Sequence, residues 1–185
     1  MAELLLRKTT AKQVQQIYLK VINQYPSPYV LSKASHSVLR EIIRPLGMEN
    51  TRTELLIKLG KELVEKYGGA LPNDFKKLTT LPGVGQYAAS AVLSFSFGCD
   101  VAVVDTNVIR ILQRFFNIKS AKARAREDPS IRTFANELVP TNKSKVFNYA
   151  VLDFGAEICT ALKPKCSLCP LTAFCIFFNK VENKK

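Results

Sequence analysis

The chain has 185 residues, 47% of them hydrophobic, and a formal net charge of +12. This apolar content excludes a disordered tail, and the length suits one compact domain or two small lobes that share a core. No window reaches about 18 consecutive apolar residues, and the apolar run at the start is too short for a signal peptide, so a cytoplasmic protein without a membrane partner is predicted. The excess of positive charge favours a polyanionic partner, most simply nucleic acid.

Apolar residues recur at spacings of three and four in the first eighty residues, as on the buried face of a helix. The pattern predicts three helices, which span 10–25, 35–45 and 50–68, and a further short helix is expected at 74–78. Ser35 is expected to cap the second helix, Asn50 or Thr53 to begin the third, and Gly68 to end it.

The remaining regular elements are also predicted to be helical. They span 87–97, 106–116, 131–139 and 145–158. The alanine-rich start of the first of these favours a helix over a buried strand. The apolar run 101–104 has the composition of a strand, but no second strand is predicted to pair with it, so we interpret it as an extended link. The basic stretch 119–126 is interpreted as a solvated connector, and the predicted fold class is all-α.

The most specific local motif is a cysteine run near the end of the chain. Four of the five cysteines follow the pattern C-x6-C-x2-C-x5-C within 17 residues, namely Cys159, Cys166, Cys169 and Cys175. Thiolates this close together usually converge on one metal centre, and a reducing cytosol disfavours two disulfides. Spacing alone leaves both a zinc site and an iron–sulfur cluster open. Cys99 lies in an apolar run and is expected to be an inert core thiol.

A second motif, LPGVG at 81–85, directly precedes a predicted helix. Gly83 and Gly85 allow a tight turn in which backbone N–H groups point outward at the positive end of that helix. Such a turn forms an anion site without side chains, which suits a DNA phosphate. An ordinary turn between two helices is the alternative.

Two carboxylates are candidates for chemistry. Asp105 follows the apolar run 101–104 at the start of a predicted helix, where an N-cap is the simplest role. Glu3 lies beside three leucines near the start of the chain, where a lone glutamate is usually solvated.

Taken together and in this order, LPGVGQYAASAVLSFSFG, VDTNVIRILQRFF and the cysteine run resemble the helix-hairpin-helix DNA glycosylase superfamily. This superfamily includes endonuclease III and the adenine glycosylase of A/G mismatches, and the resemblance extends from about Glu3 to Cys175. It implies a [4Fe–4S] cluster on the four cysteines and Asp105 as the catalytic aspartate. It also implies a hairpin that binds DNA through Leu81, Gly83, Val84, Gly85 and Gln86.

The resemblance further implies two helical lobes with a DNA cleft between them. Residues 30–140 would form the hairpin lobe, and 1–29 would join 141–185 in the cluster lobe. Family members normally have a few tens of residues before the helix near Glu3, so the start is expected to be shortened relative to the family.

The subfamily depends on Tyr87. The matching position in endonuclease III is a lysine that attacks the sugar as an amine, and a phenol cannot form that Schiff base. Tyrosine here, together with ELLLRKTTAKQVQQIY and YGGALP, is similar to archaeal thymine-DNA glycosylases of T/G mismatches. We therefore expect a monofunctional base-excision-repair enzyme that releases thymine or uracil opposite guanine. The alternatives are an adenine glycosylase, an endonuclease III-like glycosylase and AP lyase, and a catalytically impaired DNA-binding module.

The resemblance assigns roles to other positions. Tyr87 would line the base pocket, and Glu3 would bond to the edge of the flipped base. Met48 matches an intercalating wedge, with a core position as the alternative. Arg7 and Lys8 match a loop that enters the DNA opposite the wedge. The implied partner is double-stranded DNA with a mismatched or damaged base, bound by a nucleoid-associated monomer.

Overall fold

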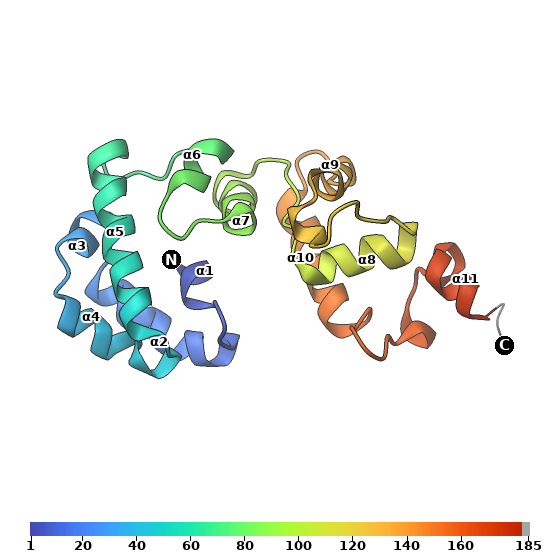
Figure 1. Ribbon diagram of the computed structural model, residues 1–185, viewed down its shortest axis with the longest axis horizontal. Helices are drawn as coiled ribbons and strands as arrows, with labels where there is room; N and C mark the ends of the chain where they lie inside the picture. Colours follow the sequence, from blue (N-terminus) through green and yellow to red (C-terminus); the bar gives the residue numbers. More distant parts are fainter. Residues whose placement is uncertain (183–185) are drawn as a thin grey trace. The chain divides into compact units, whose positions relative to one another are not determined.

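The computed structural model describes the backbone of residues 1–182 and the side chains of residues 1–180 (Figure 1). Within this part of the chain every regular element is a helix and no strand occurs, so the all-α prediction is confirmed. The chain divides into two units, Met1–Ala89 and Ser90–Lys185.

The lobes implied by the family resemblance, 30–140 and 1–29 with 141–185, divide the chain differently from these units. They stay a prediction. Residues 183–185 of the cluster lobe lie outside the described residues.

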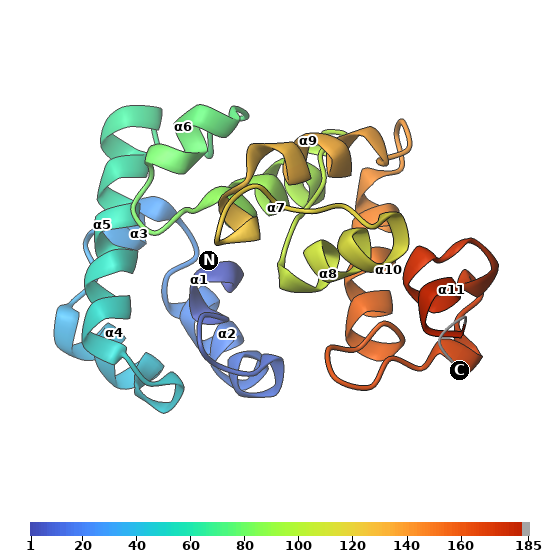
Figure 2. The ribbon, with the colours of Figure 1, turned by 45° about the vertical axis from the view of Figure 1, so that its right-hand side comes forward.

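The first unit consists of short helices around one long helix, and α3 and α4 both pack along α5 (Figures 1 and 2). Its elements are α1 (Ala2–Leu5), α2 (Ala11–Gln24), α3 (Pro28–Ser32), α4 (His36–Ile43), η1 (Arg44–Leu46), α5 (Glu49–Tyr67), α6 (Phe75–Thr80) and the first turn of α7 (Gln86–Phe97). Leu39, Ile43 and Leu56 are among its fully buried side chains. The periodicity did not predict α3, because a helix of five residues is too short to display an apolar repeat.

The starts of two helices, α4 and α5, differ from those predicted from the sequence. Ser35 is the N-cap residue of α4, but its hydroxyl lies 3.0 Å from that of Ser37 and does not cap the backbone. Helix α5 begins at Glu49, not at Asn50 or Thr53, and its N-cap residue Met48 has a left-handed backbone with φ of +53°. The predicted C-cap of α5 at Gly68 is confirmed.

The buried Arg52 holds the turn that precedes α5. Its Nε donates to Gly47 O at 2.8 Å, and its Nη1 donates to Leu4 O at 2.7 Å and Leu5 O at 3.0 Å. Its Nη2 donates to Arg7 O. Burial, and secondarily the charge of Arg7, lowers the pKa of Arg52. One guanidinium thus joins the Gly47–Met48 turn to the end of α1 and to the loop that follows it.

Arg52→Met is expected to destabilise the protein by about 3 kcal/mol, because several carbonyls in a water-poor environment lose their donor at once. Urea denaturation of the cluster-loaded protein measures the loss. Arg52→Lys keeps the charge but has fewer hydrogen-bond donors, so it should lower the free energy of unfolding by an intermediate amount. An unchanged free energy of unfolding in Arg52→Met would contradict this role.

The second unit packs around helix α8, with α10 and α11 beside it (Figure 2). Its elements are the rest of α7, α8 (Thr106–Phe116), η2 (Ala125–Glu127), α9 (Pro129–Glu137), α10 (Ser144–Glu157), η3 (Cys166–Leu168), η4 (Thr172–Phe174) and α11 (Ile176–Glu182). Its core includes Ala102, Val108, Leu112 and Ile131. A Cβ on Gly155 would lie 2.7 Å from Asn107 Cβ, so the glycine permits the close approach of α10 to α8.

The extended link 101–104 is confirmed, and side-chain amides take the place of a neighbouring strand. Asn148 accepts from Val103 N at 2.8 Å and donates to Val101 O at 2.8 Å. Asn136 accepts from Ala102 N at 2.8 Å. These bonds satisfy buried backbone groups that an isolated strand would leave without partners.

Asn148→Leu is expected to lower the free energy of unfolding by about 3 kcal/mol, because the similar-sized side chain leaves Val101 O, Val103 N and the Ser94 hydroxyl without their amide partner. Asn136→Leu removes the single bond to Ala102 N and should cost about 1 kcal/mol. Parallel urea titrations test the difference. Equal losses in the two variants would show that the amide network around Asn148 is not what holds the link.

Candidate active site and iron–sulfur centre

The predicted hairpin connects α6 to α7. Val84 N donates to Leu81 O at 3.0 Å, which closes the turn. Gly83 has φ of +74°, and a Cβ there would lie 2.5 Å from Leu55 Cδ2. This position therefore favours glycine for its backbone conformation, and a side chain there would displace the end of the Leu55 side chain. The first N–H groups of α7 lack intrahelical acceptors, as at the start of any α-helix, which suits an anion site.

Arg7 connects the loop after α1 to this hairpin, since its guanidinium donates to Gly83 O. Lys8, the next residue, is exposed and has a left-handed backbone with φ of +51°. Met48 is 48% exposed, which excludes a core position for its side chain.

One open pocket of the first unit brings several predicted site residues together. It has about 710 Å³ of empty space and is lined by Glu3, Leu6, Arg7, Gly85, Tyr87 and Ala88. Burial raises the pKa of Glu3, and the nearby terminal ammonium partly opposes the shift. A raised pKa keeps the carboxyl protonated to a higher pH, in which form it can donate a hydrogen bond.

Asp105 is the N-cap of α8, as predicted. Its Oδ1 accepts from Val108 N at 2.8 Å, and its Oδ2 accepts from Asn107 Nδ2 at 3.0 Å. Both carboxylate oxygens therefore have a donor, and the group is half-buried with a fixed orientation. The N-cap role leaves a catalytic role open, because each oxygen has further acceptor capacity.

Arg110 connects Asn107, which donates to Asp105, with the backbone of Cys159. Arg110 Nη2 donates to Asn107 Oδ1 at 2.9 Å and to Gly155 O at 2.6 Å, while its Nε donates to Cys159 O at 2.8 Å. The side chain at the start of α8 and the backbone of the cysteine loop thus share one hydrogen-bonded chain.

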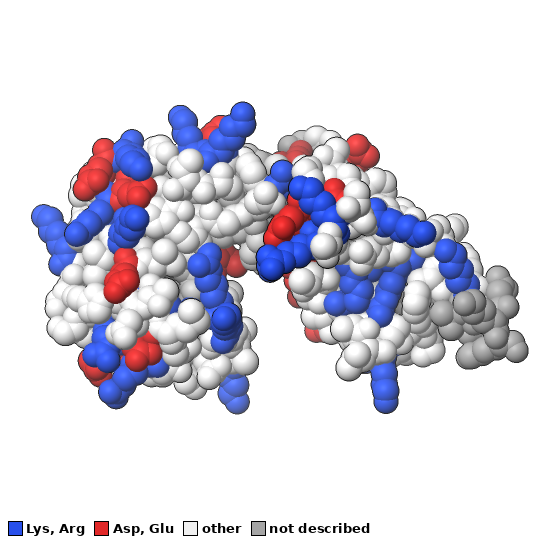
Figure 3. Space-filling model, in the orientation of Figure 1, with Lys and Arg blue, Asp and Glu red and all other residues white. Residues whose placement is uncertain are grey.

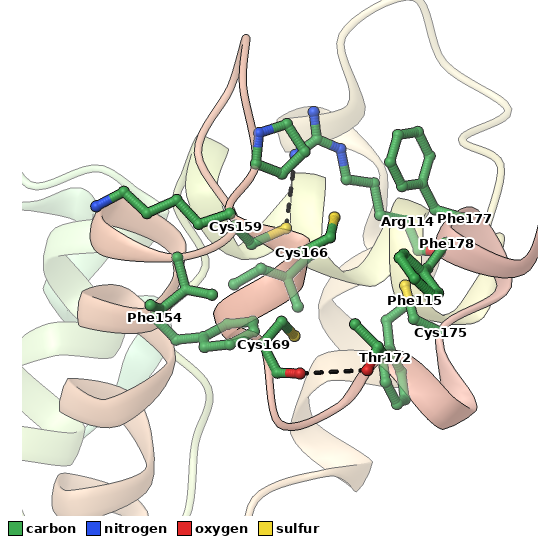
Figure 4. A pocket seen from close by; sticks show the side chains of 14 residues that line it. Arg114, Phe115, Phe154, Cys159, Cys166, Cys169, Thr172, Cys175, Phe177 and Phe178 are labelled. Atoms are coloured by element: carbon green, nitrogen blue, oxygen red, sulfur yellow. Dashed lines mark hydrogen bonds between the residues drawn. The ribbon is translucent and has the colours of Figure 1, made fainter. Parts of the chain in front are cut away.

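The four cysteines of the motif line one cavity (Figure 4). Phenylalanine side chains from α8, α10 and α11 form much of its wall, among them Phe115, Phe154, Phe177 and Phe178. Burial raises the pKa of Cys166, as do the negative charges that the other three cysteines carry when ionised, which places all four sulfurs in one electrostatic environment.

Four cysteine thiolates can hold either a zinc ion or an iron–sulfur cluster. Among the residues that the structure describes, no three cysteine, histidine or carboxylate groups converge on a point that a metal ion would occupy.

Arg114 is one of the basic residues that line this cavity (Figure 4). Its Nη1 lies 3.5 Å from Cys159 Sγ and 2.7 Å from Thr160 O, and its guanidinium stacks 5.0 Å from the centroid of Phe177. A positive charge this close to the Cys159 sulfur stabilises its thiolate form, which is the form of cysteine that binds a metal.

Arg114→Gln is expected to speed loss of the cluster about tenfold, a typical effect of removing a group that supports a metal ligand. The decay of visible cluster absorbance in the presence of an iron chelator measures this. Lys165→Gln, at another basic residue of the same cavity, is the matched control. Equal decay rates in the two variants would contradict a specific role for Arg114.

Several of these supporting residues were missed from the sequence. Arg110 and Arg114 are four residues apart, which places them on one side of the amphipathic helix α8, and this spacing was the available signal. Arg52 and Asn148 had no local signal, because their partners are distant in the sequence.

The fold and these sites define a class of DNA repair protein. The model of the HhH-GPD superfamily of base excision DNA repair proteins matches residues 1–135, and the chain belongs to this family. The iron–sulfur binding domain of endonuclease III matches residues 159–175, and the cofactor is a [4Fe–4S] cluster, as predicted. The predicted identity as a DNA glycosylase of base excision repair is confirmed, and DNA is the partner.

Within this family, the chain is similar to several thymine-DNA glycosylases. The chain is 49% identical to a thymine/uracil-DNA glycosylase of Pyrobaculum aerophilum, over 98% of this chain and 80% of the relative. It is 46% identical to a thymine-DNA glycosylase of Aeropyrum pernix, over 96% of this chain and 81% of the relative. The solved structure of a thermostable thymine-DNA glycosylase matches with a TM-score of 0.92 and 35% identity, over 97% of this chain and 82% of the other.

None of the helices in the described part of the chain has the length and apolar character needed to cross a membrane.

Proposed function

We propose that this protein releases thymine or uracil opposite guanine from double-stranded DNA, as a monofunctional glycosylase. The observation that carries the proposal is the pocket lined by Tyr87, Glu3 and Arg7, which has a phenol where a lyase would have its amine. The names of the relatives from Pyrobaculum aerophilum and Aeropyrum pernix agree with this substrate.

In the proposed reaction, the bond between the base and C1′ of the sugar breaks as positive charge develops on the sugar. The Asp105 carboxylate stabilises that charge and accepts a proton from water, whose oxygen bonds to C1′. The base leaves as an anion with the electron pair of the broken bond and takes a proton from solvent, to which Asp105 returns the proton it accepted. The two hydrogen bonds from Val108 N and Asn107 orient the carboxylate before the substrate arrives.

The mismatched base must first leave the helical stack, which mispairing makes easier. We assign Tyr87 to the wall of the base pocket and Glu3 to a hydrogen bond with the base edge. The exposed Met48 would fill the gap in the stack, and Arg7 with Lys8 would enter from the opposite side. The hairpin residues Leu81, Gly83, Val84, Gly85 and Gln86 would hold a phosphate.

Cys159, Cys166, Cys169 and Cys175 are the proposed cluster ligands, since all four line one cavity. When bound, the cluster supplies iron–thiolate bonds that cross-link the cysteine loop. We further propose that the protein acts as a monomer, because one chain carries every proposed site residue, and that its charge of +12 keeps it near chromosomal DNA.

Base release from end-labelled duplexes tests the proposal. The panel contains G/T, G/U, A/G, A/8-oxoguanine and thymine glycol, each scored with and without alkali. Alkali-dependent cleavage at G/T and G/U is expected. Release from A/G instead would indicate an adenine glycosylase, strand breaks without alkali would indicate a lyase, and no release with an intact cluster would indicate a binding module.

A further inference from the structure

The basic connector 119–126 is an ordered loop. The buried Asp128 organises it by accepting from the Ser120 hydroxyl at 2.8 Å, from Ala121 N at 2.9 Å and from the Ser130 hydroxyl at 2.7 Å. The hydroxyls of Ser130 and Ser120 hold the pKa of Asp128 well below its usual range, so the carboxylate remains ionised. The expectation of a solvated connector is confirmed, because residues 121–124 and Arg126 are exposed, and hydrogen bonds in addition hold its backbone in place.

The ordered loop forms an open cavity against the start of α8. The cavity has about 680 Å³ of empty space and is lined by Thr106, Ile109, Arg124, Ala125 and Arg126. Thr106 directly follows Asp105 in the chain, so the cavity borders the helix end that carries the proposed catalytic carboxylate.

The charge at this cavity is positive and incompletely balanced. Glu127 pairs with both arginines, 3.3 Å from Arg124 Nη1 and 4.0 Å from Arg126 Nε, and all three side chains are more than half exposed. Exposed pairs of this kind are weak, so an incoming anion can displace the glutamate. Basic side chains are also prominent on the face of this unit drawn in Figure 3.

We propose that Arg124 and Arg126 bind a DNA backbone phosphate in this cavity, adjacent to the nucleotide on which Asp105 acts. Guanidinium groups recognise phosphate oxygens through paired, charge-assisted hydrogen bonds, and the exposed Thr106 hydroxyl is a further donor. Placing this phosphate beside the target nucleotide rests on the proposed function. Binding of a DNA phosphate by Arg124 and Arg126 does not depend on it.

The first test uses the salt dependence of binding to a fully matched duplex, which needs no base release. In the double variant R124Q/R126Q the slope of log K against log salt should fall by about 0.9 for each DNA phosphate that the variant no longer neutralises. The matched control is K119Q/K122Q, which removes two cations of the same connector that do not line the cavity. Fluorescence anisotropy measures both slopes in the cluster-loaded protein. Equal falls in the two variants, or no fall in R124Q/R126Q, would overturn the proposal.

The variant E127Q is expected to change the affinity for duplex DNA in the opposite direction. Because it removes the competing carboxylate, it should tighten duplex binding several-fold at low salt. Unchanged or weaker binding in E127Q would overturn the displacement argument, and with it the proposed phosphate site.

The second test locates the phosphate with G/T duplexes in which one phosphate at a time is a neutral methylphosphonate. Neutralising a phosphate next to the mismatched thymidine should weaken binding of the wild type but not of R124Q/R126Q. Absence of such a position would overturn the placement beside Asp105. If the base-release panel fails while the slope changes as expected, the proposed substrate is wrong and the phosphate site stands.

Discussion

Asp105→Asn is expected to lower the rate of base release at least about 100-fold while binding to a G/T duplex is retained. Asparagine caps helices as well as aspartate does, so Val108 N keeps its acceptor and α8 keeps its start. The variant loses the negative charge that would stabilise the developing cation. Its new amide also faces the Asn107 amide that now donates to Oδ2, so one of the two must reorient.

Single-turnover base release and equilibrium binding, measured on the same G/T duplex, separate the two effects. Asp74→Asn is the matched control, because Asp74 caps α6 in the same way by accepting from Lys77 N at 2.7 Å. The control should release base at nearly the wild-type rate. Wild-type release by Asp105→Asn would remove Asp105 from the mechanism.

Tyr87→Lys is expected to create strand cleavage that needs no alkali. The new amine would lie in the pocket that contains Glu3 and Arg7, where it can attack C1′ and form a Schiff base. The neighbouring Arg7 charge favours the neutral, nucleophilic form of the lysine. Borohydride trapping of a covalent protein–DNA adduct is the measurement.

Two controls test the position of the amine. Gln86→Lys places a lysine one residue away on the exposed start of α7, outside the residues that line the pocket, and should give no adduct. Tyr87→Phe keeps the ring without an amine and should also give none. Absence of an adduct in Tyr87→Lys, in a variant that still binds DNA, would contradict the pocket assignment of residue 87.

The helices with strong local signals were predicted closely. Thr10 and Gln13 form the capping box of α2, and Asp105 caps α8, because these interactions join residues three apart in the sequence. Helix α3 was missed, as was α11 after the cysteine loop, since both are too short for a periodic pattern. The start of α5 was placed late because its N-cap residue, Met48, has no side chain that caps a helix.

In the candidate site, too, some residues were found from the sequence and others only from the structure. The cysteine spacing made the four cysteines candidate ligands, and the resemblance to the DNA glycosylase superfamily made Asp105 and Tyr87 candidate site residues. The bonds from Arg110 to Asn107 and to Cys159 were not visible, and neither was the cavity beside Arg124.

By itself, the sequence determined the all-α class, the hairpin motif, the four-cysteine run and the missing lysine at position 87. These features depend on residues that lie within a few positions of one another, so they can be recognised in the amino-acid sequence. Only the tertiary structure decided that Arg52 binds the end of α1, that Asn148 replaces a strand beside 101–104, and that Arg114 lies against a cysteine sulfur. Those contacts join residues more than forty positions apart, and they form only because buried polar groups must find partners wherever packing places them.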